Sequence, residues 1–136
     1  MRCRELMKTD FYSVAPAETA QAAARKMRDL NVGFLPVCEP DGVVVGTITD
    51  RDLAIRLVAE DLSASEPVGD LMTEEVVGCN PTDDVSIAEK LMAQCQKSRL
   101  LVIGEDGKLA GVISLSDIAQ ADPTWVGQTL GERLSP

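Results

Sequence analysis

A pattern of one glycine, one hydroxyl residue and one aspartate occurs twice in this chain of 136 residues. It reads Gly46-Thr47-Ile48-Thr49-Asp50-Arg51-Asp52 in the first copy and Gly111-Val112-Ile113-Ser114-Leu115-Ser116-Asp117 in the second. The aspartate can accept hydrogen bonds from both hydroxyls of a ribose, while hydroxyls and the free N–H groups at the start of a helix suit a phosphate. The pattern therefore predicts two places for a sugar phosphate.

The same spacing also predicts helix caps. Thr49 and Ser114 are good N-cap residues, and each is followed three positions later by an acid, Asp52 or Asp117. This resembles a capping box, with aspartate in place of glutamate. We expect these caps whatever the function, because they satisfy N–H groups that the first helical turn leaves unpaired. The duplication of the pattern is what favours a ligand site as well.

Both copies belong to a longer internal repeat with an offset of 65 positions (71 − 6). Glu5-Leu6-Met7 matches Asp70-Leu71-Met72, and the register continues without a gap to the match of Asp52 with Asp117. A repeated unit this short cannot bury its apolar face alone. We therefore expect the copies to cover each other across a pseudo-two-fold axis, with a pair of matching clefts between them as the place to seek function.

Each copy predicts a short lead-in helix and then strand, helix, strand, strand and helix. Apolar residues recur at helical spacing over 20–30 and 85–95, and Asp-Gly between apolar runs indicates a hairpin. Pro16 and Pro81 predict extended backbone at Ala15 and Asn80, with groups free to meet a ligand. The remaining predicted elements are 11–15, 35–38, 43–48 and 50–60 in the first copy, and 76–80, 100–103, 109–113 and 115–121 in the second.

These elements divide the chain into a first repeat at 1–60, a linker at 61–65, a second repeat at 66–122 and a tail at 123–136. The linker reads Asp-Leu-Ser-Ala-Ser, and the tail has weak periodicity. Trp125 and Leu130 of the tail could dock on the body of the protein or on a second subunit.

Composition excludes several classes of function. A net charge of −9 argues against a nucleic-acid surface, which needs clustered lysine and arginine. No run approaches the roughly 18 apolar residues of a membrane span, and no apolar signal segment follows Met1. We expect a cytoplasmic protein with neither nucleic acid nor membrane as a partner.

The chain has four cysteines, no histidine and no C-x-x-C pair, so neither a zinc site nor a disulfide framework is predicted. Cys38, Cys79 and Cys95 match apolar residues of the other copy and are interpreted as buried small hydrophobes. Cys3 is predicted to be the most exposed thiol. The sequence also lacks a nucleophile elbow and a phosphate-gripping glycine loop, which predicts that the protein is not an enzyme.

Several motifs that occur in order, twice, resemble the paired cystathionine-β-synthase (CBS) domain, or Bateman module. They are the two Leu-Met motifs, Gly33-Phe34-Leu35-Pro36-Val37 and the two glycine–hydroxyl–aspartate patterns. The resemblance covers residues 1 to about 122. It implies an α/β (α+β) fold of two tandem β-α-β-β-α repeats related by a pseudo-two-fold axis, with the sheets packed face to face and the helices outside.

The resemblance also implies roles for single residues. Asp52 and Asp117 match the acids that hold the ribose. The residues implied to contact hydroxyls or phosphate are Thr49, Arg51, Arg99, Ser114 and Ser116. The residues implied to form the adenine wall are Val14, Ala15, Pro16, Cys79, Asn80 and Pro81.

The resulting hypothesis is a regulatory module that senses AMP, ADP, ATP or S-adenosylmethionine in the clefts between the repeats. It requires no cofactor and takes no catalytic step, and it acts on an unknown effector protein in trans. The resemblance implies a homodimer. The alternative is a ligand-free dimeric interaction adaptor, in which the duplicated motifs serve only as caps.

Overall fold

The computed structural model describes residues 1–121, so the predicted tail with Trp125 and Leu130 lies outside the described residues. The chain forms two compact units. We call Tyr12–Val76 the repeat-1 unit, and Met1–Phe11 together with residues 77–121 the repeat-2 unit.

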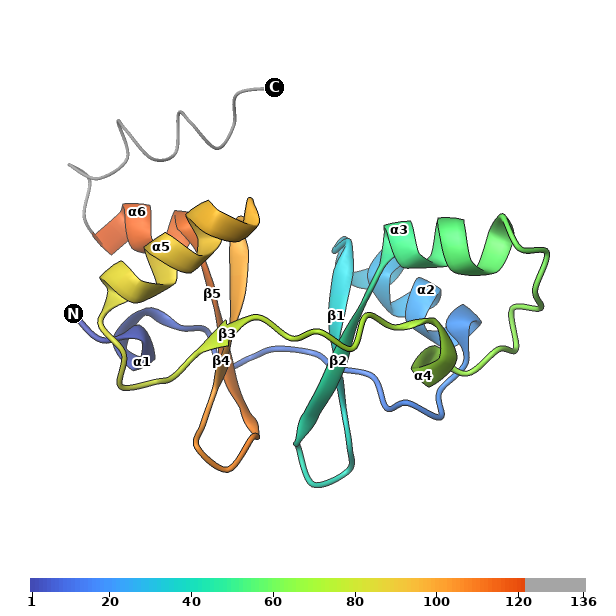
Figure 1. The fold of residues 1–136 in the computed structure, drawn as a ribbon, viewed down its shortest axis with the longest axis horizontal. Coiled ribbons are helices and arrows are strands. Elements are labelled where there is room, and N and C mark those ends of the chain that lie inside the picture. Colours follow the sequence, from blue (N-terminus) through green and yellow to red (C-terminus); the bar gives the residue numbers. More distant parts are fainter. Residues whose placement is uncertain (122–136) are drawn as a thin grey trace. The chain divides into compact units, whose positions relative to one another are not determined.

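The repeat-1 unit contains an antiparallel hairpin with its helices on one face of the sheet (Figure 1). Its elements are α2 (Ala20–Leu30), β1 (Phe34–Cys38), β2 (Val44–Thr49), α3 (Asp50–Asp52), the π-helix η1 (Leu53–Val58) and α4 (Val68–Leu71). Val14 adds one parallel bridge to Val37, where the sequence predicted a longer strand.

The repeat-2 unit contains a three-stranded sheet in the order β3-β4-β5. Strand β3 runs parallel to β4, and β4 runs antiparallel to β5. Its elements are α1 (Cys3–Leu6), β3 (Gly78–Cys79), α5 (Val85–Cys95), β4 (Arg99–Ile103), β5 (Leu109–Ser114) and α6 (Leu115–Ala121).

The long helices α2 and α5 occupy the predicted spans and begin and end in the same way. Thr19 caps α2 by accepting a hydrogen bond from the Ala22 N–H at 3.1 Å, and Asp84 caps α5 by accepting from the Ser86 N–H at 3.0 Å. Asn31 and Gln96 end them in the left-handed conformation, with φ of 55° and 54°. Local sequence signals therefore determine both helices.

The lead-in segments, residues 3–8 and 68–73, pack on the opposite repeat. Helix α1 contacts α6 and β5, while α4 contacts α2 and β2. Figure 1 shows α1 in blue beside the yellow and red elements of the repeat-2 unit. Lys8 pairs with Val112 through backbone hydrogen bonds of 2.8 and 3.0 Å, and Thr73 pairs with Thr47 through bonds of the same lengths. The compact units are thus composed differently from the sequence repeats.

Glycine at two positions permits this exchange, in which the lead-in segment of each repeat packs on the other repeat. A Cβ on Gly46 would lie 2.7 Å from the carbonyl oxygen of Thr73, and a Cβ on Gly111 would lie 2.8 Å from that of Lys8. Side chains there would separate the paired backbones. The first residue of each glycine–hydroxyl–aspartate pattern therefore serves the crossing of the lead-in segment.

Each unit buries its own aliphatic core. The largest fully buried side chains are Leu35, Ile48, Met92, Ile113, Val14, Val37, Val68, Val102 and Cys3. The prediction that Cys3 is the most exposed thiol is wrong, because α1 turns it into the core of the repeat-2 unit, where it is 0% exposed. Cys38 and Cys79 are buried as predicted, whereas Cys95 is half-buried.

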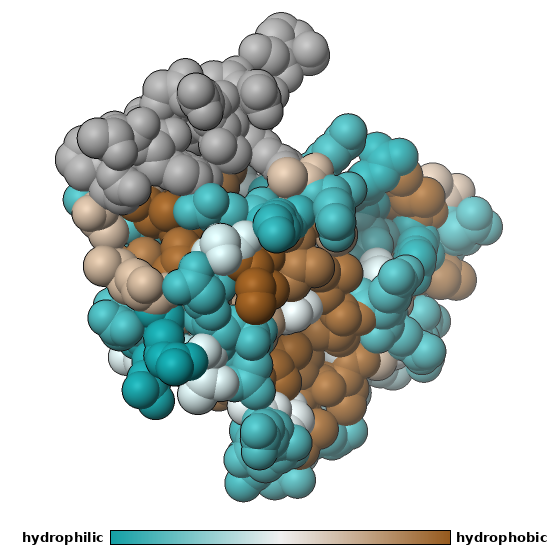
Figure 2. All heavy atoms as spheres, turned by 60° about the vertical axis from the view of Figure 1, so that its left-hand side comes forward, coloured by the Kyte–Doolittle hydropathy of each residue, from teal (hydrophilic) through white to brown (hydrophobic). Residues whose placement is uncertain are grey.

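Apolar side chains also reach the surface, where they stand among hydrophilic ones (Figure 2). Ile55, Val58 and Leu62 are the most exposed large hydrophobics along η1 and the turn after it. Among the described residues, no helix combines the length and the apolar character that a crossing of the bilayer requires.

Candidate functional site

The first predicted corner lies where β2 passes into α3. Thr49 Oγ1 accepts a hydrogen bond from the Asp52 N–H at 3.0 Å, and Asp52 Oδ2 accepts one from the Thr49 N–H at 3.0 Å. The predicted capping box is therefore confirmed. It occupies one carboxylate oxygen of Asp52.

The second corner, where β5 passes into α6, has the same geometry. Ser114 Oγ accepts from the Asp117 N–H at 3.1 Å, and Asp117 Oδ2 accepts from the Ser114 N–H at 3.0 Å. The Ser116 and Ser114 hydroxyl oxygens lie 2.9 Å apart. The corner thus gathers two hydroxyls and one carboxylate.

The two carboxylates are nearly removed from solvent. The Asp52 side chain is 11% exposed and the Asp117 side chain 10%. Because Oδ2 of each aspartate accepts a hydrogen bond within the cap, Oδ1 is the oxygen that can accept a hydrogen bond from another group. Burial strengthens a hydrogen bond to such an oxygen.

Each Oδ1 atom faces a residue of an exchanged lead-in segment. Thr73 Oγ1 donates to Asp52 Oδ1 at 3.3 Å, and Lys8 Nζ lies 3.9 Å from Asp117 Oδ1. Thr73 and Lys8 are equivalent in the repeat, since each follows a Leu-Met motif. Sequence reasoning missed both, although that shared position was a usable signal.

Arg56 is a third neighbour that the sequence did not indicate. Its Nε lies 3.9 Å from Asp52 Oδ1, and its Nη1 donates to the carbonyl oxygens of Leu71 at 3.3 Å and Met72 at 2.9 Å. It therefore fastens the C-terminal end of α4 beside the first corner. The equivalent position in the second copy is Ala121, so the two corners differ in charge.

In the repeat-1 unit the predicted adenine wall runs along the edge of β1. Val14 is buried and exchanges backbone hydrogen bonds with Pro36 at 3.0 Å and with Cys38 at 2.9 Å. The prediction that the Ala15 N–H is free for a ligand is wrong, because this group donates to Glu18 Oε2 at 2.6 Å. The half-buried Pro16 accepts from the Gly69 N–H at 2.9 Å.

The equivalent wall in the repeat-2 unit repeats this arrangement. Cys79 is buried on β3, and the half-buried Pro81 accepts from the Arg4 N–H at 2.9 Å. The Asn80 N–H donates to Asp83 Oδ2 at 2.8 Å, so the prediction of a free backbone group is wrong here too. The reason is the same at both walls: an acid three positions later turns back onto the residue before the proline.

The two predicted arginines occupy different places. Arg99 begins β4, and the hairpin register sets it directly opposite Ser114. The structure thus brings this exposed cation to the second corner. Arg51 is exposed on α3, one residue before Asp52, and its N–H donates to Asp50 Oδ1 at 2.8 Å.

Comparison with known proteins gives the class of this chain. The family model of the CBS domain matches it twice, over residues 3–59 and 68–123. The CBS domain-containing protein YhcV of Bacillus subtilis is 39% identical over 116 residues, which cover 85% of this chain and 81% of the relative. The chain belongs to the CBS-domain family and carries two copies of the domain.

Solved structures agree with this assignment. The crystal structure of Hypoxic Response Protein I with two coordinated zinc ions has a TM-score of 0.79 and 30% identity, covering 88% of this chain and 98% of that one. The structure of CBSX2 in complex with AMP, a CBS-pair protein from Arabidopsis thaliana, has a TM-score of 0.78 and 23% identity, covering 91% and 97%. This second likeness shows the fold. Within residues 1–121, no three cysteine, aspartate or glutamate side chains are grouped to hold a metal.

Proposed function

We propose that the chain is a regulatory binding module and that its two corners hold adenosine-derived ligands. The observation that carries this proposal is the nearly buried carboxylate of Asp52 and of Asp117, each with Oδ2 held by the cap and Oδ1 turned to long, replaceable contacts. Two hydroxyls of a ribose are suitable replacements for such contacts. A capping role alone does not require the side chains of both aspartates to be only 10–11% exposed.

The second corner is the better candidate for a phosphate. Ser114 and Ser116 offer hydroxyl donors, and Arg99 stands opposite Ser114 across the hairpin. Lys8 adds a second cation beside Asp117. Hydrogen bonds between ionised groups are stronger than neutral ones, so we expect nucleotides to bind this corner more tightly than adenosine itself.

CBSX2, which shares the fold, was solved with AMP. This supports AMP as the first ligand to test, followed by ADP, ATP and S-adenosylmethionine. Binding would act by favouring whichever conformation has the higher affinity for the ligand. The regulated effector would be a separate protein.

The alternative function is an interaction adaptor without a ligand. The exposed apolar side chains of Ile55, Val58 and Leu62, which are 46%, 72% and 44% exposed, favour a protein contact on η1. We propose a homodimer as the first assembly to test, and analytical ultracentrifugation of wild-type protein beside a Val58→Glu variant is the measurement.

Titration calorimetry with adenosine, AMP, ADP, ATP and S-adenosylmethionine tests the ligand. We expect Asp52→Asn and Asp117→Asn each to weaken binding at its own corner by tenfold or more, because a buried charge-assisted hydrogen bond contributes about 1.5–3 kcal/mol. Asparagine retains an acceptor for the cap.

The matched controls are Asp41→Asn and Asp106→Asn. These equivalent acids also accept a local backbone N–H, from Val43 at 3.1 Å and from Lys108 at 3.0 Å, but in the hairpin turns. They should leave binding unchanged. The absence of heat with all five ligands, or an equal loss in the turn variants, would reject the adenosyl site and leave the adaptor.

A further inference from the structure

Two buried cysteines meet in the repeat-2 unit. Cys3 begins α1 and Cys79 lies on β3, 76 positions later, yet their Sγ atoms are 3.5 Å apart. The residues are 0% and 5% exposed. A disulfide requires sulfurs about 2.05 Å apart, so each would move by about 0.7 Å. Small side-chain rotations supply such a movement.

The repeat-1 unit contains the same pair of positions without thiols. The residues equivalent to Cys3 and Cys79 are Val68 and Val14, and both belong to the buried core of that unit. The fold is thus satisfied there by two aliphatic side chains. In the repeat-2 unit both partners of the contact are cysteine, and packing alone does not require that.

We propose that Cys3 and Cys79 form a reversible intramolecular disulfide, which fastens helix α1 to strand β3. The link would close a loop that contains the whole Tyr12–Val76 unit. It would hold the exchanged lead-in segment, whose position otherwise depends on hydrogen bonds and on packing against the core of the repeat-2 unit. The proposal is independent of any ligand at the two corners.

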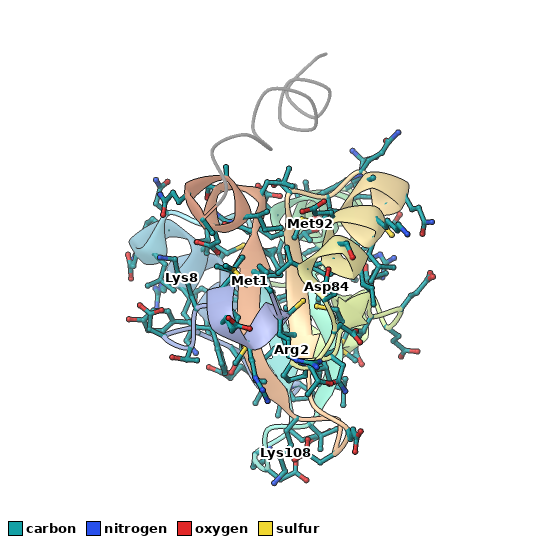
Figure 3. The ribbon with its side chains drawn as sticks, turned by 90° about the vertical axis from the view of Figure 1, so that its left-hand side faces the viewer. Met1, Arg2, Lys8, Asp84, Met92 and Lys108 are labelled. Atoms are coloured by element: carbon teal, nitrogen blue, oxygen red, sulfur yellow. The ribbon has the colours of Figure 1, made fainter. Side chains whose placement is uncertain are left out.

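While α1 is packed on the unit, both thiols are buried and cannot meet an oxidant. Burial and the contact with Cys3 raise the pKa of Cys79 to about 12, and burial raises the pKa of Cys3 in the same direction. Oxidation therefore begins with the opening of α1. Figure 3 shows the repeat-2 unit from the side of α1, where Arg2 lies beside Asp84. The Cys3 N–H donates to the Asp83 carbonyl at 2.9 Å, and opening must break this bond.

The oxidant is a small-molecule disulfide such as oxidised glutathione. In the opened form the Cys3 thiolate attacks one sulfur of the oxidant and releases one small thiol, leaving a mixed disulfide. Cys79 then loses its proton to solvent, and its sulfur displaces the second small thiol. Two protein thiols are oxidised, and one small disulfide is reduced to two thiols.

The test is equilibration of the full chain in glutathione buffers of increasing oxidised fraction, followed by alkylation in denaturant, intact mass measurement and peptide mapping. We expect a species with no covalent link between chains, which has lost two hydrogens and carries alkylation at Cys38 and Cys95 only. Its thermal midpoint should rise by roughly 5–10 °C, because the loop is long. Dithiothreitol should reverse both changes.

The control variant is Cys3→Val with Cys79→Val, which copies the repeat-1 core and should fold but not respond. Cys38→Val should respond like the wild type. Four alkylated thiols after equilibration with excess oxidised glutathione would overturn the proposal. A link that involves Cys38 or Cys95, or a link between chains, would overturn it equally.

Discussion

Replacement of Gly46 by alanine tests how closely a lead-in segment crosses strand β2. The new Cβ would lie 2.7 Å from the Thr73 carbonyl oxygen and 2.8 Å from Met72 Sδ. The methionine side chain can move, but the carbonyl is held by its hydrogen bond from the Thr47 N–H at 3.0 Å. The clash therefore has to be relieved by moving the backbone.

The size of the effect follows from these contacts. Overpacking costs about 1–3 kcal/mol, and weakening the paired bonds between Thr47 and Thr73 adds about 1 kcal/mol. Alanine regains about 0.5–1 kcal/mol over glycine within a strand. The free energy of unfolding should fall by about 1–3 kcal/mol, or about 4–12 °C in the thermal midpoint.

Urea unfolding followed by far-ultraviolet circular dichroism measures this change. The matched control is Gly33→Ala, whose Cβ would have the side chain of Asp50 as its nearest neighbour, at 3.1 Å. This exposed side chain can rotate away, so the control should change stability by less than about 0.5 kcal/mol. Equal stability of Gly46→Ala and wild type would refute the close crossing of the two backbones. It would also refute the placement of Thr73 beside Asp52, which depends on that crossing.

The remaining predictions concern pH and ligand binding. The pKa of Cys79 in the folded state is about 12, which is above that of an unfolded thiol. The resulting stabilisation is complete below about pH 9 and is lost toward pH 12. Denaturant titrations should therefore show that Cys79→Val loses less stability than the wild type between these pH values. Hydrogen bonds from Ser86 lower the pKa of Asp84 to about 2. Asp84→Ala removes the cap of α5 and should lower stability at pH 7, and its difference from wild type should shrink as pH falls from about 4 to about 2. AMP at 100 times its dissociation constant should raise the free energy of unfolding by about 2.7 kcal/mol; a flat thermal shift would contradict binding.

Much of the fold could be predicted because its signals are local. The helices over 20–30 and 85–95 follow from their apolar spacing, and the hairpins follow from Asp-Gly turns. The reciprocal caps at the two corners were predictable for the same reason. In each, a hydroxyl and an acid three positions apart bond to backbone groups of the same short segment.

Contacts between distant segments were not predictable in this way. The burial of Cys3 depends on residues about 80 positions away, and the approach of Lys8 to Asp117 spans more than 100 positions. The acids that accept hydrogen bonds from the N–H groups of Ala15 and Asn80 lie only three positions away in the sequence. They escaped prediction because each can face solvent or turn back, and the sequence does not distinguish these choices.

The sequence by itself determined the repeat, the identity of its elements and the chemistry gathered at each corner. All of these depend on hydrogen bonds and apolar spacing within a few residues of one another. Only the tertiary structure decided which lead-in segment lies on which repeat, and so which residue faces each aspartate and which two thiols meet. That choice depends on how two backbones separated by many tens of residues pack at a glycine, and no short stretch of the chain encodes it.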